Sequence, residues 1–289
     1  MKFSAYIKIT YIIFLCTTLI FSQSFQLKNQ PSDNIQFHLN YLHPVYKEIN
    51  VQYYAENKNL NMISLGMNVP VSEKINLVFN LPVAFMNWEI KYKNQNTSQQ
   101  NPDRSLSESA LGNIYFAFQL AYGRKSPSAL NFEIGIYLPT ISDDKNLSTN
   151  LAMFANYYNI AEYLHNAIAI NAFVSKWYII SDVFEWGFEA GPVALFSNTG
   201  NSRRELFLHL SSGFNVNINR LYWGFEFLGM MNGSSNFNDI SDQFVSSVVF
   251  GAGYKFSNII PNIFYKFDFN SDVTKYQSGL FGIKVITEL

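Results

Sequence analysis

The stretch at residues 110–140 constrains the fold of this chain more than any other feature. It holds two runs, 113–122 and 130–138, in which a large apolar side chain occupies every second position. A turn-forming cluster rich in Gly, Ser and Pro separates them at 123–128. Successive side chains of a β-strand point to opposite faces, so each run has one apolar face and one polar face. The stretch therefore predicts a β-hairpin whose large aliphatic side chains all lie on one face.

The same alternation recurs along the rest of the chain and predicts twelve strands. They are expected at about 49–55, 60–70, 75–92, 113–122, 130–138, 166–176, 184–196, 205–218, 221–227, 244–256, 263–269 and 281–285. An even number of strands brings both ends of a barrel to the same side of a membrane. The predicted fold class is all-β: a transmembrane antiparallel β-barrel of about 12 strands, give or take two, with short periplasmic turns and long outer loops.

The composition favours a barrel over a soluble domain or a helical membrane protein. Charged residues make up only 14% of the 289 residues and aromatic residues 17%, whereas soluble domains carry about 25% charged residues. No internal stretch reaches the roughly 18 continuous apolar residues that a membrane-spanning helix needs. An apolar, aromatic outer wall suits a barrel in lipid, and a closed barrel pairs every backbone group of its strands.

The N-terminus has the features of an export signal. Two lysines precede a short apolar segment at 9–21, and Ser22 is a small residue suited to the position before cleavage. The alternative is a retained anchor helix, which the short apolar segment disfavours. Cys16 is the only cysteine, so cleavage would leave no disulfide, thiol catalyst or cysteine metal site. The expected organisation is a signal peptide at 1–22, a periplasmic leader at 23–46 and the barrel at 47–289.

The connections predict which end of the barrel faces outward. Short turns are expected at one end, at 72–74, 123–128, 178–183, 219–220 and 257–261. Long loops are expected at the other end, at 92–108, 141–165 and 232–242, with a short turn at 56–59 as the exception. Segment 141–165 has mixed periodicity and fits a loop helix, a lumen plug or part of a strand. We interpret it as a long loop.

Several short motifs resemble one bacterial outer-membrane family. They are Asn80-Leu81-Pro82-Val83, Leu111-Gly112-Asn113-Ile114-Tyr115-Phe116, Ile136-Tyr137-Leu138-Pro139-Thr140 and the C-terminal run 261–267. These motifs resemble the outer-membrane transporters linked to phenol meta-pathway degradation, which are broadly similar to the fatty-acid-transporter type of porin. The resemblance implies a transporter-type barrel and does not identify a cargo. The family usually has an acidic residue where this chain has Asn113, and often a glycine where it has Ile141.

The alternation also predicts which polar side chains line the lumen. The expected lumen-lining residues are Glu133, Glu189, His209, Ser211, Asn215, Glu226, Lys266, Asp268 and Lys284. A solvated or mutually paired lumen is the favoured interpretation, because barrel interiors are polar in general. The alternative is a charged constriction that selects solutes.

One motif raises an enzymatic alternative. His209-Leu210-Ser211-Ser212-Gly213 resembles the His-x-Ser-Asn-Gly region of outer-membrane phospholipase A, with Ser212 in place of the family's Asn. A histidine beside a serine can deprotonate it for acyl transfer, and Asn219 would be the residue that orients His209. However, Leu206, Leu208 and Leu210 occupy the lipid-facing positions of the same strand, so Ser211 and His209 are expected to point inward, away from a lipid substrate.

Together these features predict a non-enzymatic barrel in the outer membrane of a Gram-negative bacterium. Its expected function is passive passage of small solutes, hydrophobic ones included. The alternatives are the lipid hydrolase and a plugged structural or adhesive barrel. No phosphate loop or metal-ligand cluster occurs in the sequence, so no cofactor or metal is expected. A net charge of −1 argues against nucleic-acid binding. The expected partners are outer-membrane lipid, the barrel assembly machinery and the small solute.

Overall fold

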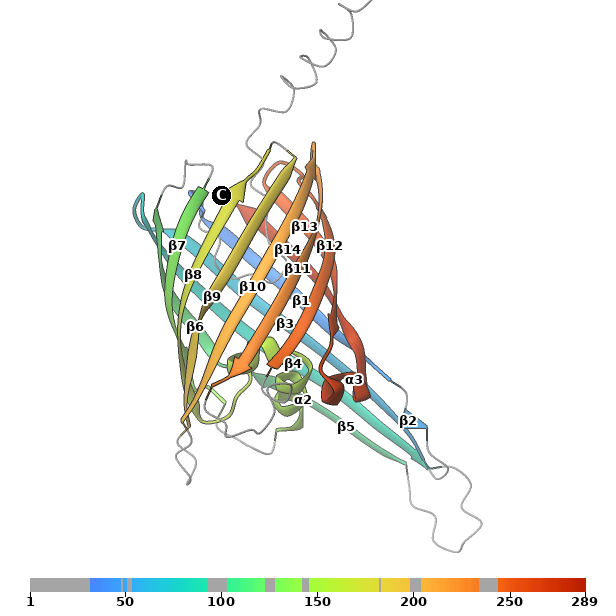
Figure 1. Ribbon diagram of the computed structural model, residues 1–289. Coiled ribbons are helices and arrows are strands. Elements are labelled where there is room, and N and C mark those ends of the chain that lie inside the picture. Colours follow the sequence, from blue (N-terminus) through green and yellow to red (C-terminus); the bar gives the residue numbers. More distant parts are fainter. Residues whose placement is uncertain are drawn as a thin grey trace, which may run out of the picture.

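The computed structural model forms a closed antiparallel β-barrel of twelve strand positions (Figure 1). It describes residues 32–47, 49–50, 54–92, 103–122, 128–141, 146–181, 183–197, 204–233 and 244–289. The barrel strands are β1 (Gln36–Tyr46), β3 (Tyr54–Pro70), β4 (Ile75–Tyr92), β5 (Arg104–Leu111), β6 (Ile114–Tyr122), β7 (Ser128–Leu138), β8 (Ala167–Ile179), β9 (Phe184–Ser197), β10 (Arg204–Ile218), β11 (Leu221–Asn232), β12 (Phe244–Tyr254), β13 (Ile259–Asp268) and β14 (Gln277–Glu288).

Strand pairing explains how thirteen segments make twelve positions. Neighbouring strands pair from β4 through to β14, and the ring closes because β1 pairs with both β14 and β3, and β3 pairs with β4. Segments β5 and β6 both pair with β4 and are two halves of one strand, interrupted at Gly112 and Asn113. The interruption lies opposite Pro82, which lacks a backbone donor, so the ladder cannot continue there unbroken.

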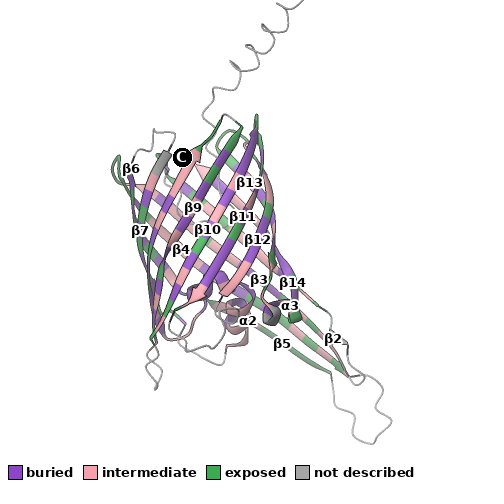
Figure 2. Ribbon diagram, in the orientation of Figure 1, coloured by how far each residue is buried: buried purple, intermediate pink, exposed green. Residues whose placement is uncertain are grey.

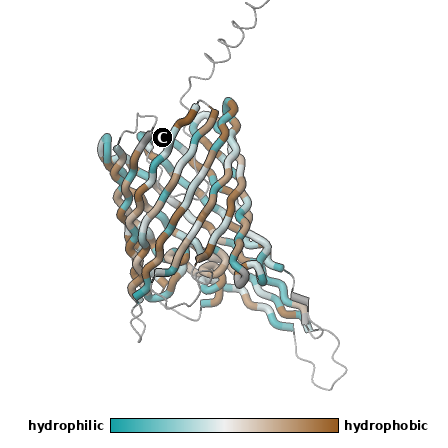
Figure 3. The backbone as a smooth tube through the Cα atoms, in the orientation of Figure 1, coloured by the Kyte–Doolittle hydropathy of each residue, from teal (hydrophilic) through white to brown (hydrophobic). Residues whose placement is uncertain are grey.

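Burial alternates along the strands as the sequence pattern predicts. On β6, for example, Phe116 and Phe118 are 44% and 64% exposed, whereas Tyr115 and Ala117 between them are buried. Buried and exposed stretches, and hydrophilic and hydrophobic ones, alternate along the strands in view (Figures 2 and 3). Leu206 and Leu210 are exposed on β10 and Leu208 between them is half-buried on the same face, whereas Phe207 and His209 are buried. The predicted barrel and its lipid-facing leucines are therefore confirmed.

The N-terminal part of the barrel differs from the prediction. Residues 36–46, expected to be part of a periplasmic leader ending at 46, form barrel strand β1. The expected turn at 56–59 is wrong, because β3 runs through it as one 17-residue strand paired with β4. The alternation is interrupted at His43 and Pro44 in the first place, and residues 56–59 are all polar in the second. The predicted signal peptide at 1–22 lies outside the described residues.

The two ends of the barrel differ in their connections. Five of them are short and lie at the end that also holds the C-terminus, where the strands are joined by residues 71–74, 123–127, 180–183, 219–220 and 255–258. The other end carries the longer connections, including the short strand β2 (Ile49–Asn50) and the helices α2 (Leu147–Ala155), η1 (Tyr157–Glu162) and α3 (Ser271–Tyr276). This asymmetry matches the predicted one, although part of the expected loop at 92–108 is strand β5.

Within the described residues, no helix combines the length and the hydrophobicity that crossing a membrane would require.

Candidate functional site

The connection between β7 and β8 folds into the mouth of the barrel. Helix α2 begins where the Asn146 side chain accepts hydrogen bonds from the backbone of Ser148 and Thr149. Glu108 on β5 accepts two more, from Leu147 N at 2.8 Å and Ser148 N at 3.2 Å. These acceptors satisfy amides that a helix N-terminus leaves free, and the Glu108 charge suits the positive end of the helix dipole. The wall of the barrel therefore fixes where α2 starts.

Asn113 holds the far end of the same connection. Its side-chain Nδ2 donates to the carbonyl oxygens of Ala161 at 2.9 Å and Leu164 at 2.7 Å, and its Oδ1 accepts from Thr140 N at 3.1 Å. Its backbone N–H, released from the strand ladder at the β5–β6 interruption, donates to Glu162 O at 2.7 Å. Only an amide side chain can donate and accept in this way. The interruption in the wall is therefore the attachment point for residues 140–164.

Helix η1 packs against the inner wall at the centre of this assembly. Tyr158 is buried, and its hydroxyl lies 2.5 Å from Ser211 Oγ on β10. The Tyr158 ring also lies 4.6 Å from the ring of His209, which in turn lies 5.6 Å from Phe173 on β8. Burial raises the pKa of Tyr158 above its usual value, so its hydroxyl stays protonated and able to donate. At this level part of the connection therefore lies inside the barrel, against its inner wall.

The C-terminal end of α2 is tied to a buried ion pair. Gln277 Nε2 donates to Ala155 O at 3.2 Å and to Asp268 Oδ2 at 2.9 Å. The other oxygen of Asp268 accepts from Ser247 at 2.7 Å and lies 3.2 Å from Lys266 Nζ. Lys266 is only 1% exposed. A buried lysine is stable as a cation only beside such a partner, so the pair and its hydrogen bonds form one unit.

A second polar network lies on the inner face of the wall and joins β6, β7 and β8. Glu133 accepts hydrogen bonds from Tyr115, from Gln119 Nε2 at 2.7 Å and from Asn171 Nδ2 at 3.3 Å. Gly135 makes room for it, since a Cβ there would lie 2.2 Å from Tyr115 Oη and 2.5 Å from Asn171 Oδ1. Glu133 is thus held in place by neighbouring strands rather than solvated.

All nine expected lumen residues lie on the inner side of the wall. Six of them, at positions 133, 189, 209, 211, 215 and 226, are no more than 6% exposed, as is Lys266. Asp268 joins Lys266 as described, and Lys284 lies beside the buried Asn262 in the β13–β14 register. Four of the nine are carboxylates and two are lysines. The structure brings Ser211 and His209 together around Tyr158 and pairs Lys266 with Asp268, whereas Glu133 belongs to a separate network.

The structure does not bring Asn219 to His209, as the phospholipase-like alternative requires. Asn219 sits at the exposed tip of the β10–β11 turn, with a left-handed φ of 58°, eight residues along the strand from Ser211. At about 3.3 Å per residue this separates the two by roughly 26 Å, far beyond hydrogen-bonding reach of His209. Ser211 is buried and bonded to Tyr158. The alternative role of Asn219 in orienting His209 is therefore wrong.

Sequence reasoning missed the residues that hold the connection. In the sequence, Asn113 stands out only as a departure from a family motif, and Tyr158 lies in a segment of mixed periodicity. The departure was a usable signal, because exchanging a carboxylate for an amide adds two hydrogen-bond donors. Many amides also line the interior: of the buried polar residues in the described part, ten are Asn and three are Gln.

Comparison with known proteins shows which solved structures share this fold. No family model and no curated protein sequence matches the chain. Among solved structures, an outer-membrane channel from Pseudomonas putida F1 superposes with a TM-score of 0.59 at 9% identity, covering 93% of this chain and 100% of the other. The fold is shared with outer-membrane channel barrels. The NanC porin (TM-score 0.54, 8% identity, 88% and 100% covered) and the KdgM porin (0.50, 7%, 87% and 99%) are also similar.

The described residues contain no group of three or more His, Cys, Asp or Glu side chains arranged to hold a metal ion.

Proposed function

We propose that this chain is an outer-membrane channel through which small solutes pass passively. The observation that carries the proposal is the closed ring of strands with apolar side chains outside and polar side chains inside. Such a wall suits lipid on one side and an aqueous or polar path on the other. The similarity in fold to outer-membrane channels supports it. A location in the outer membrane of a Gram-negative bacterium, after export through a cleaved signal, belongs to the same proposal.

The inner wall favours polar solutes over hydrophobic ones. Its amides offer both donors and acceptors, and Asn215, fully buried, makes no side-chain hydrogen bond to the described part of the chain. A hydrophobic solute would leave such groups unpaired, which costs free energy. The resemblance to transporters linked to phenol degradation is carried by the short motifs alone.

Carboxylates outnumber lysines among the expected lumen residues, so the channel should prefer cations. Replacing Glu226, which is fully buried on β11, with Gln removes one negative charge while keeping the side-chain shape. Under a salt gradient across a planar bilayer, the reversal potential of Glu226→Gln is expected to move toward that of an unselective pore. An anion-selective native channel would contradict this assignment.

The connection at 140–164 acts as a plug that limits flow. Single-channel recording of the native chain, and of a variant with residues 142–163 replaced by a short Gly/Ser linker, tests this. We expect small or brief openings for the native barrel and a larger conductance for the variant, with an unchanged conductance when residues 234–242 are shortened instead. Absence of conductance in both the native and linker proteins would overturn the channel proposal.

The second candidate is a plugged structural or adhesive barrel. The burial of Tyr158 and its hydrogen bond to Ser211 favour it, because they keep the connection inside the wall. The recordings above separate the two, since a structural barrel conducts only after the plug is removed. Outer-membrane lipid and the barrel assembly machinery are the proposed partners in either case.

A further inference from the structure

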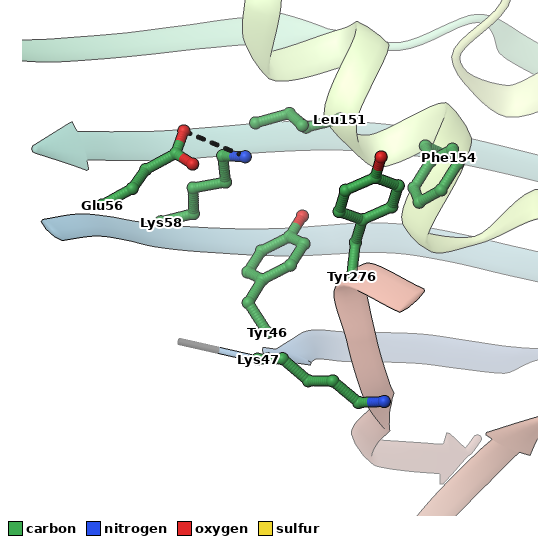
Figure 4. A pocket seen from close by; sticks show the side chains of 7 residues that line it. All are labelled: Tyr46, Lys47, Glu56, Lys58, Leu151, Phe154 and Tyr276. Atoms are coloured by element: carbon green, nitrogen blue, oxygen red, sulfur yellow. Dashed lines mark ion pairs between the residues drawn. The ribbon is translucent and has the colours of Figure 1, made fainter. Parts of the chain in front are cut away.

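A pocket of about 240 Å³ lies at the end of the barrel that carries the long connections (Figure 4). Strands β1 and β3 form its floor, and α2 and α3 flank it. The volume is below the roughly 300 Å³ at which pockets for drug-sized molecules begin. The pocket therefore suits a solute with a single ring rather than an extended chain.

Three aromatic rings from three different elements form the apolar part of this pocket. Tyr46 comes from the end of β1, Phe154 from α2 and Tyr276 from α3. The rings of Phe154 and Tyr276 meet edge to face, 6.1 Å apart at 68°. The backbone holds the group together, because Lys47 N donates to Tyr276 O at 2.9 Å and a register shift follows Val45 in the β1–β14 ladder. Such shifts re-aim side chains.

An ion pair and a hydroxyl form the polar part. Lys58 Nζ lies 3.0 Å from Glu56 Oε1, and both side chains are largely buried, at 23% and 10% exposure. Lys58 Nζ also lies 5.9 Å from the centre of the Trp88 ring, which helps to hold it in place. The Tyr46 hydroxyl points into the space between Lys58 and Tyr276 (Figure 4) and, within the described residues, has no hydrogen-bond partner although it is buried.

These groups discriminate between classes of ligand. An apolar solute would leave the Tyr46 hydroxyl without a partner and would remove water from around the ion pair, at a cost in free energy. An anion would gain little, because Glu56 already neutralises Lys58, and Lys47, the other lysine of the lining, is exposed to screening by salt. A neutral ring with several hydroxyls satisfies both parts. Its polarised C–H groups can lie on the electron-rich ring faces, while its hydroxyls bond to Glu56, Lys58 and Tyr46.

We propose that this pocket is a capture site for a neutral monosaccharide ring at the mouth of the barrel. The assignment rests on the proposed channel function for its biological meaning, since it names the class of solute presented to the lumen. The amide-rich inner wall fits the same class, because uncharged donors and acceptors suit sugar hydroxyls. Binding at the mouth does not itself require passage, so a negative result for the capture site would not overturn the channel, and the reverse also holds.

The test is titration of the full-length protein in nanodiscs with D-glucose and D-galactose, followed by calorimetry and saturation-transfer NMR. At least one hexose is expected to bind. Tyr46→Phe should weaken binding about 3- to 10-fold, the range of one hydrogen bond. Its unfolding temperature should stay equal or rise, because the hydroxyl it removes is buried and unpartnered in the free protein. Phe154→Leu should weaken binding similarly, and Tyr254→Phe, at the opposite end of the barrel, should not.

Each contrary result overturns the assignment. One is the absence of binding of either hexose at 20 mM. Another is hexose binding that neither Tyr46→Phe nor Phe154→Leu alters. A third is tighter binding of the two other probes, benzoate and D-glucuronate, which would indicate an anion site. Swelling of liposomes in hexose solutions reads out passage separately: binding without passage would contradict the channel and keep the site, and passage without binding would do the reverse.

Discussion

The hydroxyl oxygens of Tyr158 and Ser211 lie 2.5 Å apart, although the two residues are 53 positions apart in the chain. The contact joins the β7–β8 connection to the inner wall at β10. It also engages the hydroxyl of Ser211, the candidate nucleophile of the phospholipase-like motif. This one hydrogen bond therefore bears on two questions: whether the connection plugs the lumen, and whether Ser211 is available as a nucleophile.

Breaking this contact should loosen the plug. Tyr158→Phe and Ser211→Ala each remove one partner of a buried hydrogen bond, which contributes about 1 kcal/mol. In single-channel recordings both variants are expected to open about 3- to 10-fold more often. The double variant should add little to either single one, because both remove the same interaction. Ser105→Ala, on the exposed strand β5, is the control and should match the native protein. Unchanged gating in both single variants would show that the contact does not hold the plug.

The same serine variant tests the enzymatic alternative. Phospholipid hydrolysis by the purified protein should be absent, and Ser211→Ala should leave the background rate unchanged. Hydrolysis that disappears in Ser211→Ala would revive the hydrolase.

Asn113→Asp should release the far end of the plug. The carboxylate cannot donate to Ala161 O or Leu164 O, and it places a buried negative charge beside two carbonyl oxygens. Losing donors at a buried site costs about 1–3 kcal/mol, and more where a charge is left unpaired. Hydrogen exchange of α2 and η1 amides should become at least tenfold faster, while strand amides keep their rates. Asn34→Asp, at an exposed position, provides the matched control. Equal protection of α2 in Asn113→Asp and native protein would argue against this anchor.

Two glycines on the inner wall should respond differently to the same substitution. A Cβ on Gly135 would meet Tyr115 Oη at 2.2 Å, whereas a Cβ on Gly66 would meet nothing closer than 3.4 Å. Gly135→Ala is therefore expected to displace the Glu133 network and destabilise the barrel by about 1–3 kcal/mol. Gly66→Ala should change stability by less than about 0.5 kcal/mol. Urea unfolding in lipid vesicles measures both, and equal midpoints would refute the crowding argument.

Lys266→Met should destabilise the barrel through the charge that it leaves behind. Without Lys266, the Asp268 carboxylate stays buried next to Ser247 and Gln277 with no cation, a situation that costs about 3–5 kcal/mol. The double variant Lys266→Met/Asp268→Asn removes both charges and should recover most of the loss. The temperature at which the folded barrel loses its fast migration in SDS gels reports the difference. A double variant no more stable than the single one would show that charge pairing is not the cause.

Much of the fold followed from local pattern. The alternation of Ile114, Phe116 and Phe118 with smaller or polar residues was enough to predict β6, its outward face and its pairing with β7. The errors fell where that pattern is interrupted or absent. In residues 36–46 the alternation is interrupted at His43 and Pro44, and 56–59 is wholly polar, yet both are strand because neighbouring strands pair with them.

The candidate site was predicted less completely. The inward direction of residues such as Glu189 and Ser211 follows from counting along one strand. Their surroundings do not, because these depend on which distant segment occupies the barrel. Tyr158 carries no local signal of its role, and the amide at Asn113 signals a donor without identifying its partner; each acts on a residue at least 48 positions away.

The sequence by itself determined that this chain closes into an antiparallel barrel with a lipid-facing and an inner surface. It could do so because side chains alternate between those two environments at every residue, and a period of two can be recognised within a few positions. The tertiary structure alone decided that the β7–β8 connection enters the lumen and where the mouth pocket lies. Hydrogen bonds between residues far apart in the chain fix both features, and they leave no repeating pattern along it.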